Sequence, residues 1–251
     1  MEKDLQDIAG GLDVDRPRVG QIISLMRVLH NYTREAISEQ SIDVLMGFLY
    51  RHLSTTLQKI NASQLACRLG CSFCCNNWVT ASTPEILHVL KAIDSDRVDQ
   101  VRADIASAAR ATTGKSPEER RSMITPCPLL GNSACTIYES RPIVCRTAVS
   151  NDAAVCERIY LNASGEEIPG TFHHHGVKGI YGLALAGALK KAGLAPYYYE
   201  YNSALYAAML REGAEADWLS GRDVLSDIAH DPEGEMFGST WNQKIYQQAF
   251  S

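Results

Sequence analysis

The sequence lacks long apolar runs, an excess of basic residues and an apolar leader, and each absence excludes a class of protein. The longest uncharged apolar run, Gly179 to Leu189, has eleven residues, whereas a membrane-spanning helix needs about 20. Lys and Arg number 24 against 29 Asp and Glu, a net charge of −5, which argues against duplex nucleic acid and anionic membranes as partners. No apolar segment typical of a signal peptide follows the charged start Met1 to Asp4. We therefore expect a cytoplasmic protein that binds neither nucleic acid nor membrane.

The motifs of several common enzyme sites are also missing. The chain has no Gly-rich phosphate loop of the Walker or Rossmann type and no Gly-x-Ser-x-Gly nucleophile turn. Its composition, with 45% hydrophobic and 21% charged residues, is that of an ordinary globular protein. Nothing in it indicates a repeat or a low-complexity segment, so the 251 residues correspond to one large domain or two small ones.

The patterns that are present indicate helices. Apolar residues recur at helical spacing over 19–29 and 42–60, and helix-start signals such as Ser116-Pro-Glu-Glu119 recur along the chain. Strand patterns are weak, so we predict a mainly α fold: a helical bundle wrapped around a small cysteine-rich metal-binding core, with at most a short β-hairpin near Gly131-Asn132. Further helices are expected over 83–93, 96–111, 117–123, 152–160, 177–191, 197–210 and 243–250, and within 140–147, with a loop over 162–176. The expected segments are N-terminal helices over 1–63, a cysteine-cluster metal-binding domain over 64–160, and a C-terminal helical region over 161–251 that packs on it.

Eight cysteines are the most informative residues, because clustered cysteines in a reducing compartment more often bind metal or catalyse than form disulfides. Cys71 and Cys74 are separated by two residues, a spacing that lets both thiolates point at one metal. Cys67 lies one turn upstream, and Cys75 directly follows Cys74. We predict all eight as metal ligands; they fall into one group within nine residues and another within thirty, namely Cys67, Cys71, Cys74, Cys75, and Cys127, Cys135, Cys145, Cys156.

The first cluster, Cys67-Arg-Leu-Gly-Cys71-Ser-Phe-Cys74-Cys75, also matches the spacing of the radical-SAM cluster loop. Enzymes of that class place the loop after the first strand of a large α/β barrel. The residues before Cys67 here predict helices, and the strand–helix alternation of a barrel is missing downstream. A radical-SAM-type enzyme is therefore the less favoured alternative.

The second group carries a family resemblance. The run Cys127-Pro-Leu-Leu, followed by Cys135-Thr-Ile-Tyr-Glu-Ser-Arg141-Pro-Ile-Val-Cys145-Arg146, occurs in order after the upstream Cys-Cys run. Together these motifs resemble the YkgJ-type cysteine-cluster family, which is described as a zinc- or iron-chelating domain of the CxxCxxCC type. The resemblance covers about residues 67–146, and Cys156 lies beyond it. The first gap has three residues where the family name has two. Because related clusters occur in flagellin lysine N-methylases, the resemblance also implies iron–sulfur and SAM-linked chemistry as one possibility.

The kind of metal is open between two alternatives. Eight cysteines could form two zinc sites of four thiolates each, or four could hold an iron–sulfur cluster. Adjacent Cys74 and Cys75 point in different directions on most backbones, which suits a cluster or two metals better than one tetrahedral ion. We therefore favour iron–sulfur over zinc. Arg141 and Arg146 flank Cys145, and could compensate an anionic thiolate centre or capture a carboxylate substrate, or form surface pairs with Glu139 and Glu157.

Two further groups of side chains receive a mainly structural interpretation. His173, His174 and His175 could bind metal, but a polar loop beside a helix is the simpler reading. The tyrosine-rich segment from Tyr197 to Tyr206, with Glu200 and Asn202, could line a substrate pocket, but aromatic residues on helices are more often core.

Two functional classes follow, and the sequence does not decide whether the protein is an enzyme. In the first, an iron–sulfur centre serves redox or SAM-dependent modification of a peptide or small molecule. In the second, zinc holds the fold of a non-catalytic structural or interaction module. The 95 residues after Cys156 exceed what a zinc module needs, which favours the enzyme.

Overall fold

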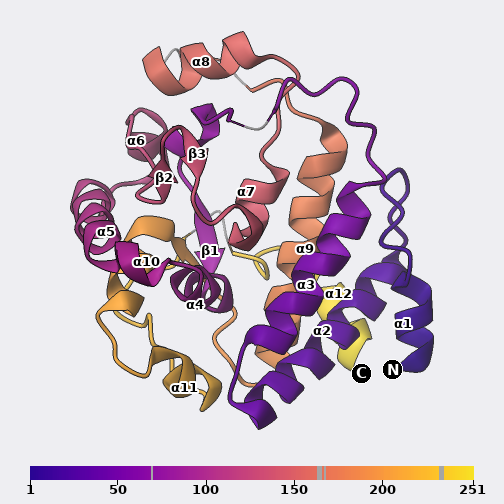
Figure 1. Cartoon of the computed structure of the whole chain (residues 1–251). Coiled ribbons are helices and arrows are strands. Elements are labelled where there is room, and N and C mark those ends of the chain that lie inside the picture. The colour runs from indigo at the N-terminus through magenta and orange to yellow at the C-terminus, as the bar shows by residue number, and fades with distance from the viewer. Residues whose placement is uncertain (69, 163–165, 167, 232–234) are drawn as a thin grey trace.

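The computed structural model describes residues 1–68, 70–162, 166, 168–231 and 235–251 and confirms a mainly helical fold (Figure 1). Its helices are α1 (Glu2–Ile8), α2 (Val19–Glu39), α3 (Asp43–Leu57), α4 (Thr83–Lys91), α5 (Val98–Thr112), α6 (Pro117–Arg121), α7 (Ile143–Thr147), α8 (Ala153–Asn162), α9 (Phe172–Lys191), α10 (Tyr201–Met209), α11 (Ala214–Leu219) and α12 (Thr240–Phe250). Short 3-10 helices are η1 (Phe73–Asn76), η2 (Ser95–Arg97) and η3 (Tyr138–Ser140). The strands are β1 (Thr80–Ser82), β2 (Leu130–Gly131), β3 (Ala134–Cys135) and β4 (Tyr198–Glu200).

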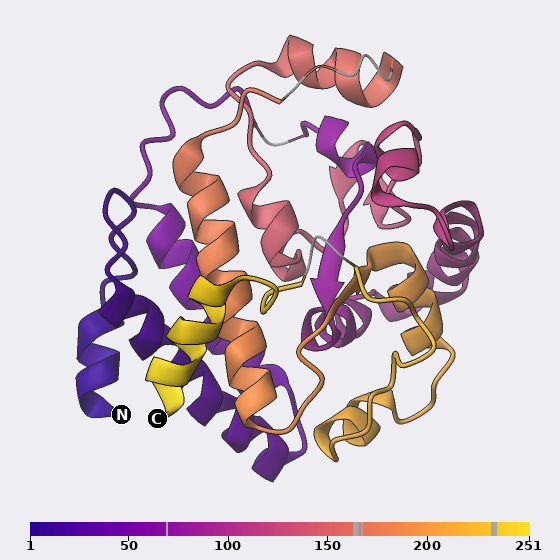
Figure 2. The same cartoon turned by 180° about the vertical axis from the view of Figure 1, so that it is seen from behind.

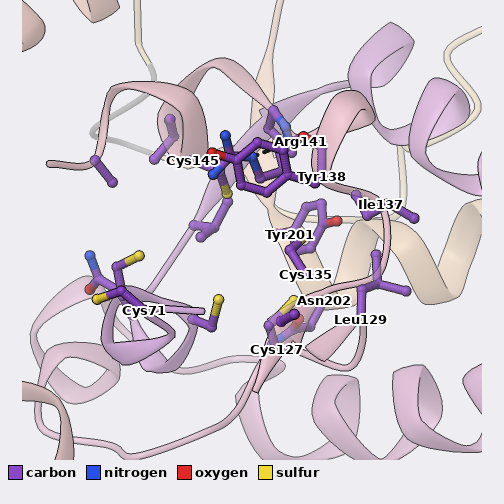
Figure 3. A pocket seen from close by; sticks show the side chains of 18 of the residues that line it. Cys71, Cys127, Leu129, Cys135, Ile137, Tyr138, Arg141, Cys145, Tyr201 and Asn202 are labelled. Atoms are coloured by element: carbon purple, nitrogen blue, oxygen red, sulfur yellow. Dashed lines mark hydrogen bonds between the residues drawn. The ribbon is translucent and has the colours of Figure 1, made fainter. Parts of the chain in front are cut away.

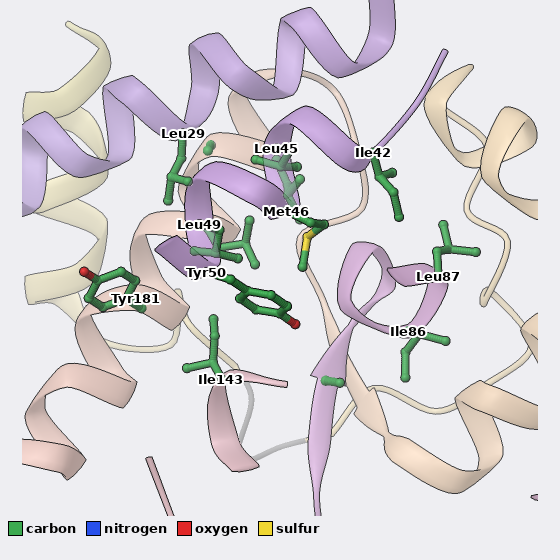
Figure 4. Packing of buried hydrophobic residues seen from close by; sticks show 14 of the residues in the cluster. Leu29, Ile42, Leu45, Met46, Leu49, Tyr50, Ile86, Leu87, Ile143 and Tyr181 are labelled. Carbon is green, nitrogen blue, oxygen red and sulfur yellow. The ribbon is translucent and has the colours of Figure 1, made fainter. Parts of the chain in front are cut away.

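The helices lie in two groups (Figures 1 and 2). On one side, α2 packs against α1, α3, α9 and α12, so helices from the two ends of the chain contact each other directly. On the other side, α10 packs against α4 and α5. Buried side chains from both sides, among them Leu49, Ile86, Ile143 and Tyr181, belong to one hydrophobic cluster (Figure 4). Among the described residues, no helix is long and apolar enough to cross a membrane.

The small residues of α9 allow a close approach to α2. A Cβ added to Gly187 would lie 2.5 Å from the Sδ of Met26, closer than atoms can pack. In contrast, a Cβ at Gly179 on the same helix would meet nothing within 4 Å. Residues Tyr181 to Leu189 are all buried, so α9 lies in the interior of the group of helices around α2.

Both sheets are antiparallel and two-stranded. The predicted hairpin is β2–β3, in which Leu130 pairs with Cys135 and Asn132 and Ser133 form the turn with positive φ. The described part of the chain contains no parallel barrel of the kind found in radical-SAM enzymes. The sequence had already made such an enzyme the less favoured alternative.

The expected helix over 197–210 is wrong at its start, because residues 198–200 form β4. This strand pairs with β1, placing Glu200 opposite Thr80. Glu200 then caps α10 by accepting hydrogen bonds from the main-chain N–H groups of Asn202 and Ser203, at 3.1 and 2.8 Å. A pairing across more than 100 residues of chain is a tertiary interaction, and local helical patterning cannot show it.

The expected loop over 162–176 is also partly wrong. Thr171 caps α9 by accepting a hydrogen bond from the N–H of His174 at 3.3 Å, so the three histidines occupy the first turn of a helix. Residues 163–165 and 167, which belong to the same expected loop, lie outside the described residues.

Candidate metal centre

Main-chain hydrogen bonds bring the two cysteine motifs together. Cys74 and Cys75 lie on η1, and the N–H of Cys127 donates to the carbonyl of Cys75 at 2.7 Å. At the other end of the first motif, the N–H of Ala66 donates to the carbonyl of Ser150 at 2.9 Å. The first cluster is therefore held between the loop that precedes β2 and the segment that follows α7.

Seven of the eight cysteines line one pocket of about 410 Å³ (Figure 3). Cys135 comes from β3 and Cys145 from α7. Apolar side chains of Val79, Leu129 and Ile137 complete part of the wall. The seven cysteines are Cys67, Cys71, Cys74, Cys75, Cys127, Cys135 and Cys145.

Cys156 does not line this pocket. It is buried on α8, a helix that packs against η1. Burial raises the pKa of its thiol, a hydrogen bond with Ser150 opposes that rise, and Cys71 and Cys74 add to it. Ser150 also donates its main-chain N–H to the Sγ of Cys67 at 3.2 Å. Cys156 therefore lies outside the pocket lining, close to the first cysteine motif.

The thiols form two sets that meet at Cys74. Burial raises the pKa of Cys145 well above its usual range, and the thiols of Cys127 and Cys74 raise it further. Burial likewise raises the pKa of Cys127 to about 12. On the other side, burial raises the pKa of Cys67, with added effects of Cys71, Cys74 and Cys156. In Figure 3, Cys71 lies apart from Cys127, Cys135 and Cys145.

The chemistry of this donor set fits a soft metal centre. Thiolate sulfur is the protein ligand that zinc and iron–sulfur clusters share. Burial raises the pKa of Cys127 and Cys145, and metal binding would displace the protons of these two thiols. Among the described residues, no three His, Cys, Asp or Glu side chains form a preformed metal-binding group. The seven cysteines instead line the wall of one pocket.

The two predicted arginines have different positions. Arg141 lines the pocket, with its guanidinium carbon 3.5 Å from the ring centroid of Tyr138. Burial raises the pKa of Cys135 and Cys145, and the charge of Arg141 opposes this effect. Arg141 therefore lies where it can stabilise thiolates.

Arg146 lies outside the pocket lining. Its Nε donates to the carbonyl of Arg141 at 2.8 Å, and a second guanidinium N–H donates to the carbonyl of Glu139. The guanidinium carbon also lies 4.1 Å from the ring centroid of Tyr50. Arg146 thus holds the turn that positions Arg141, and its hydrogen bond to Glu139 uses the main-chain carbonyl and not the carboxylate.

A further wall of the pocket comes from residues distant in sequence from the cysteine motifs. Arg120 on α6, Glu200, Tyr201 and Asn202 line it. The tyrosine-rich segment was the signal for the last three, although only Tyr201 of its tyrosines is among the lining residues. Arg120 was not predicted from the sequence. It lies in a short helix rich in charged residues, a pattern typical of the protein surface, and nothing in that pattern indicates that its side chain is buried.

The three histidines contribute nothing to the pocket lining. His173 lies with its Nε2 3.2 Å from a carboxylate oxygen of Asp15, and His174 contacts its helix cap Thr171. The histidines therefore make local contacts at the start of α9, and the expected polar loop is wrong at these positions.

Comparison with known families agrees with the chemistry of the pocket. Residues 66–162 match the model of the CxxCxxCC family, described as "putative zinc- or iron-chelating domain". This match confirms the resemblance inferred from the two motifs. The match extends further than those motifs, since it includes Cys156 and α8. No curated protein and no solved structure matches the chain.

Proposed function

We propose that the cysteine pocket binds a polynuclear metal centre, with an iron–sulfur cluster favoured over zinc. The observation that carries the proposal is that seven cysteines from two separate motifs line a single pocket. One tetrahedral zinc ion takes four ligands at about 2.3 Å, fewer than the pocket offers. A cluster, or two ions, can use thiols that surround a larger volume.

The buried set around Cys74 supplies the favoured ligands. The thiols of Cys74, Cys127 and Cys135 all raise the pKa of Cys145, and all four residues line the pocket. Four thiols are the number that holds a common iron–sulfur cluster. Cys67, Cys71 and Cys75 remain available for a second metal or for exchange of ligands. Arg141 would offset the negative charge of such a centre.

The remaining walls of the pocket favour an enzyme. Structural zinc sites are closed by four protein ligands, whereas this pocket also has polar and apolar walls without cysteine. The centre would supply electron transfer or polarisation of a bound group, and the protein walls would bind and orient a peptide or small molecule. Redox or SAM-dependent modification is the corresponding reaction class.

One observation favours the alternative, a non-catalytic module held together by zinc. The cysteine loops contain little regular structure, with η1, β2, β3 and η3 each two to four residues long. Ordering such loops costs about 1–2 kcal/mol of backbone entropy per residue, and thiolate–zinc bonds can offset that cost.

Anaerobic purification of the full chain with metal analysis separates the two. Iron with acid-labile sulfide and broad visible absorbance supports the iron–sulfur centre, whereas a colourless protein with stoichiometric zinc supports the module. Cys127→Ser and Cys145→Ser should lose metal, and Cys156→Ser is the matched control, because its thiol does not line the pocket. Folded pocket variants that keep full metal content would contradict the proposal.

A further inference from the structure

The pocket contains a buried guanidinium with a free donor. Arg120 is 4% exposed at its side chain, and its Nη1 lies 2.7 Å from a carboxylate oxygen of Glu200. The Nε of Arg120 is buried and has no hydrogen-bond partner among the described residues. A buried donor without a partner costs free energy. A bound ligand that accepts this hydrogen bond would remove that cost.

Glu200 fixes this guanidinium but does not use its Nε. Besides Arg120, the carboxylate accepts hydrogen bonds from the main chain of Asn202 and Ser203, from the Ser203 hydroxyl at 2.7 Å, and from the Thr112 hydroxyl at 3.0 Å. The position of Glu200 is therefore rigid. An arginine can bind a carboxylate through two parallel hydrogen bonds, one of which comes from its Nε–H. Glu200 accepts from Nη1 of Arg120 and leaves the Nε–H of Arg120 without an acceptor.

The charge of the pocket favours an anionic ligand. Arg68, Arg120 and Arg141 line it, against Glu200 as the single carboxylate among the described lining residues, although the chain has a net charge of −5. Arg141 is the arginine that counteracts the raised pKa of Cys135 and Cys145. The Nε–H of Arg120, which Glu200 does not accept, is thus left for another group.

The surroundings of Arg120 suit a carboxylate better than a phosphate. Phosphates are commonly bound by free main-chain N–H groups at a helix N-terminus. At the start of α10 these groups, from Asn202 and Ser203, already donate to Glu200. A carboxylate is planar and singly charged, and it can be bound by the N–H groups of Arg120 without such main-chain donors.

We propose that Arg120, supported by Glu200 and next to Asn202, binds the carboxylate of a small molecule inside the cysteine pocket. The whole pocket, of about 410 Å³, is within the range of small-molecule sites, and a metal centre held by the thiols would occupy part of that volume. Calling this molecule a substrate rests on the proposed function, whereas its binding does not depend on which metal the thiols hold.

The direct test follows the Arg120 Nε–H signal by ¹H–¹⁵N NMR on the full chain loaded with zinc, because zinc is diamagnetic and does not broaden signals near the thiols. Titration with acetate and with benzoate should shift this signal saturably, and the neutral isosteres acetamide and benzamide should not. The absence of a shift with both acids, or equal shifts with acids and amides, would overturn the proposal. The Nε–H signal of Arg211, which pairs with Asp227 on the surface, controls for ionic strength.

Variants extend the test. Arg120→Lys keeps a positive charge for Glu200 but removes the Nε donor, and it should weaken benzoate binding at least tenfold. Asn202→Asp adds a negative charge to the same wall and should abolish binding. Arg211→Lys is the matched control and should bind as the parent does; unchanged binding in Arg120→Lys would refute the assignment.

Metal per chain, measured on the same samples, separates this proposal from the previous one. Loss of benzoate binding with unchanged metal content locates the effect at Arg120. If the anaerobically purified chain holds no metal and takes none up on reconstitution, yet shows the benzoate shift, the metal proposal fails and the carboxylate site stands. If Arg120→Lys does not fold, the titration of the parent chain alone decides.

Discussion

Removing the Glu85 carboxylate should uncouple two helices that position the second cysteine motif. Glu85 is 1% exposed. It accepts hydrogen bonds from the N–H and hydroxyl of Ser82, at 3.0 and 2.6 Å, which cap α4. It also accepts the N–H of Ile143, the first residue of α7, at 2.8 Å. Because α7 carries Cys145, one buried side chain links a helix start to the pocket.

The magnitude follows from these bonds. Hydrogen bonds to a charged group contribute about 1.5–3 kcal/mol each, and Glu85→Ala would leave two main-chain donors of buried helix starts without their acceptor. Burial also raises the pKa of Glu85, which means that keeping the carboxylate ionised has a desolvation cost that alanine removes. We expect a net loss of about 3–4 kcal/mol from the free energy of unfolding. Glu85→Gln keeps one acceptor without the charge and should lose about 1–2 kcal/mol.

The chain offers a matched control for this prediction. Glu119 forms the same capping box with Ser116 at the start of α6, but on the surface. Water can replace its hydrogen bonds, so Glu119→Ala should destabilise the protein much less.

Urea unfolding followed by circular dichroism measures the stability of each variant. Peptide mapping after brief thiol alkylation of the metal-free protein measures access to Cys145, which should rise only in the Glu85 variants. Equal losses of stability for Glu85→Ala and Glu119→Ala, with Cys145 equally protected, would show that Glu85 is only a local cap.

Three further predictions concern packing, pH and metal. Gly187→Ala should destabilise the protein by about 2 kcal/mol relative to Gly179→Ala, because only the first adds a methyl group against the methionine of α2; equal thermal midpoints would contradict this close packing. Burial lowers the pKa of His52 below its usual 6.5, so the unfolded chain binds the proton first as pH falls. Its contribution to stability is therefore complete above about pH 6.5 and decreases below it, and His52→Asn should reduce the slope of unfolding free energy against pH between 8 and 5.5; an unchanged slope would refute this. Metal removal should increase hydrogen exchange over 67–80 and 126–150 but not over 19–29 and 42–60; equal protection in both states would show that metal does not hold these loops.

The sequence alone indicated the long N-terminal helices and the class of the central segment. Helical spacing of apolar residues predicted α2 and α3, because periodicity is a local property that survives in the linear chain. Cysteine spacing and the order of two motifs were sufficient to indicate the family that residues 66–162 match. Both kinds of information depend on residues close together in sequence.

Tertiary structure decided which side chains share the pocket. The pairing of β1 with β4 places Glu200 and Asn202 beside the cysteines, and α6 adds Arg120. Arg141 and Arg146 look equivalent in sequence, yet only Arg141 lines the pocket. The capping boxes at Ser82 and Ser116 show the same limit: both are readable as local motifs, but burial of Glu85 against α7 and exposure of Glu119 depend on contacts between distant segments, and local sequence does not encode them individually.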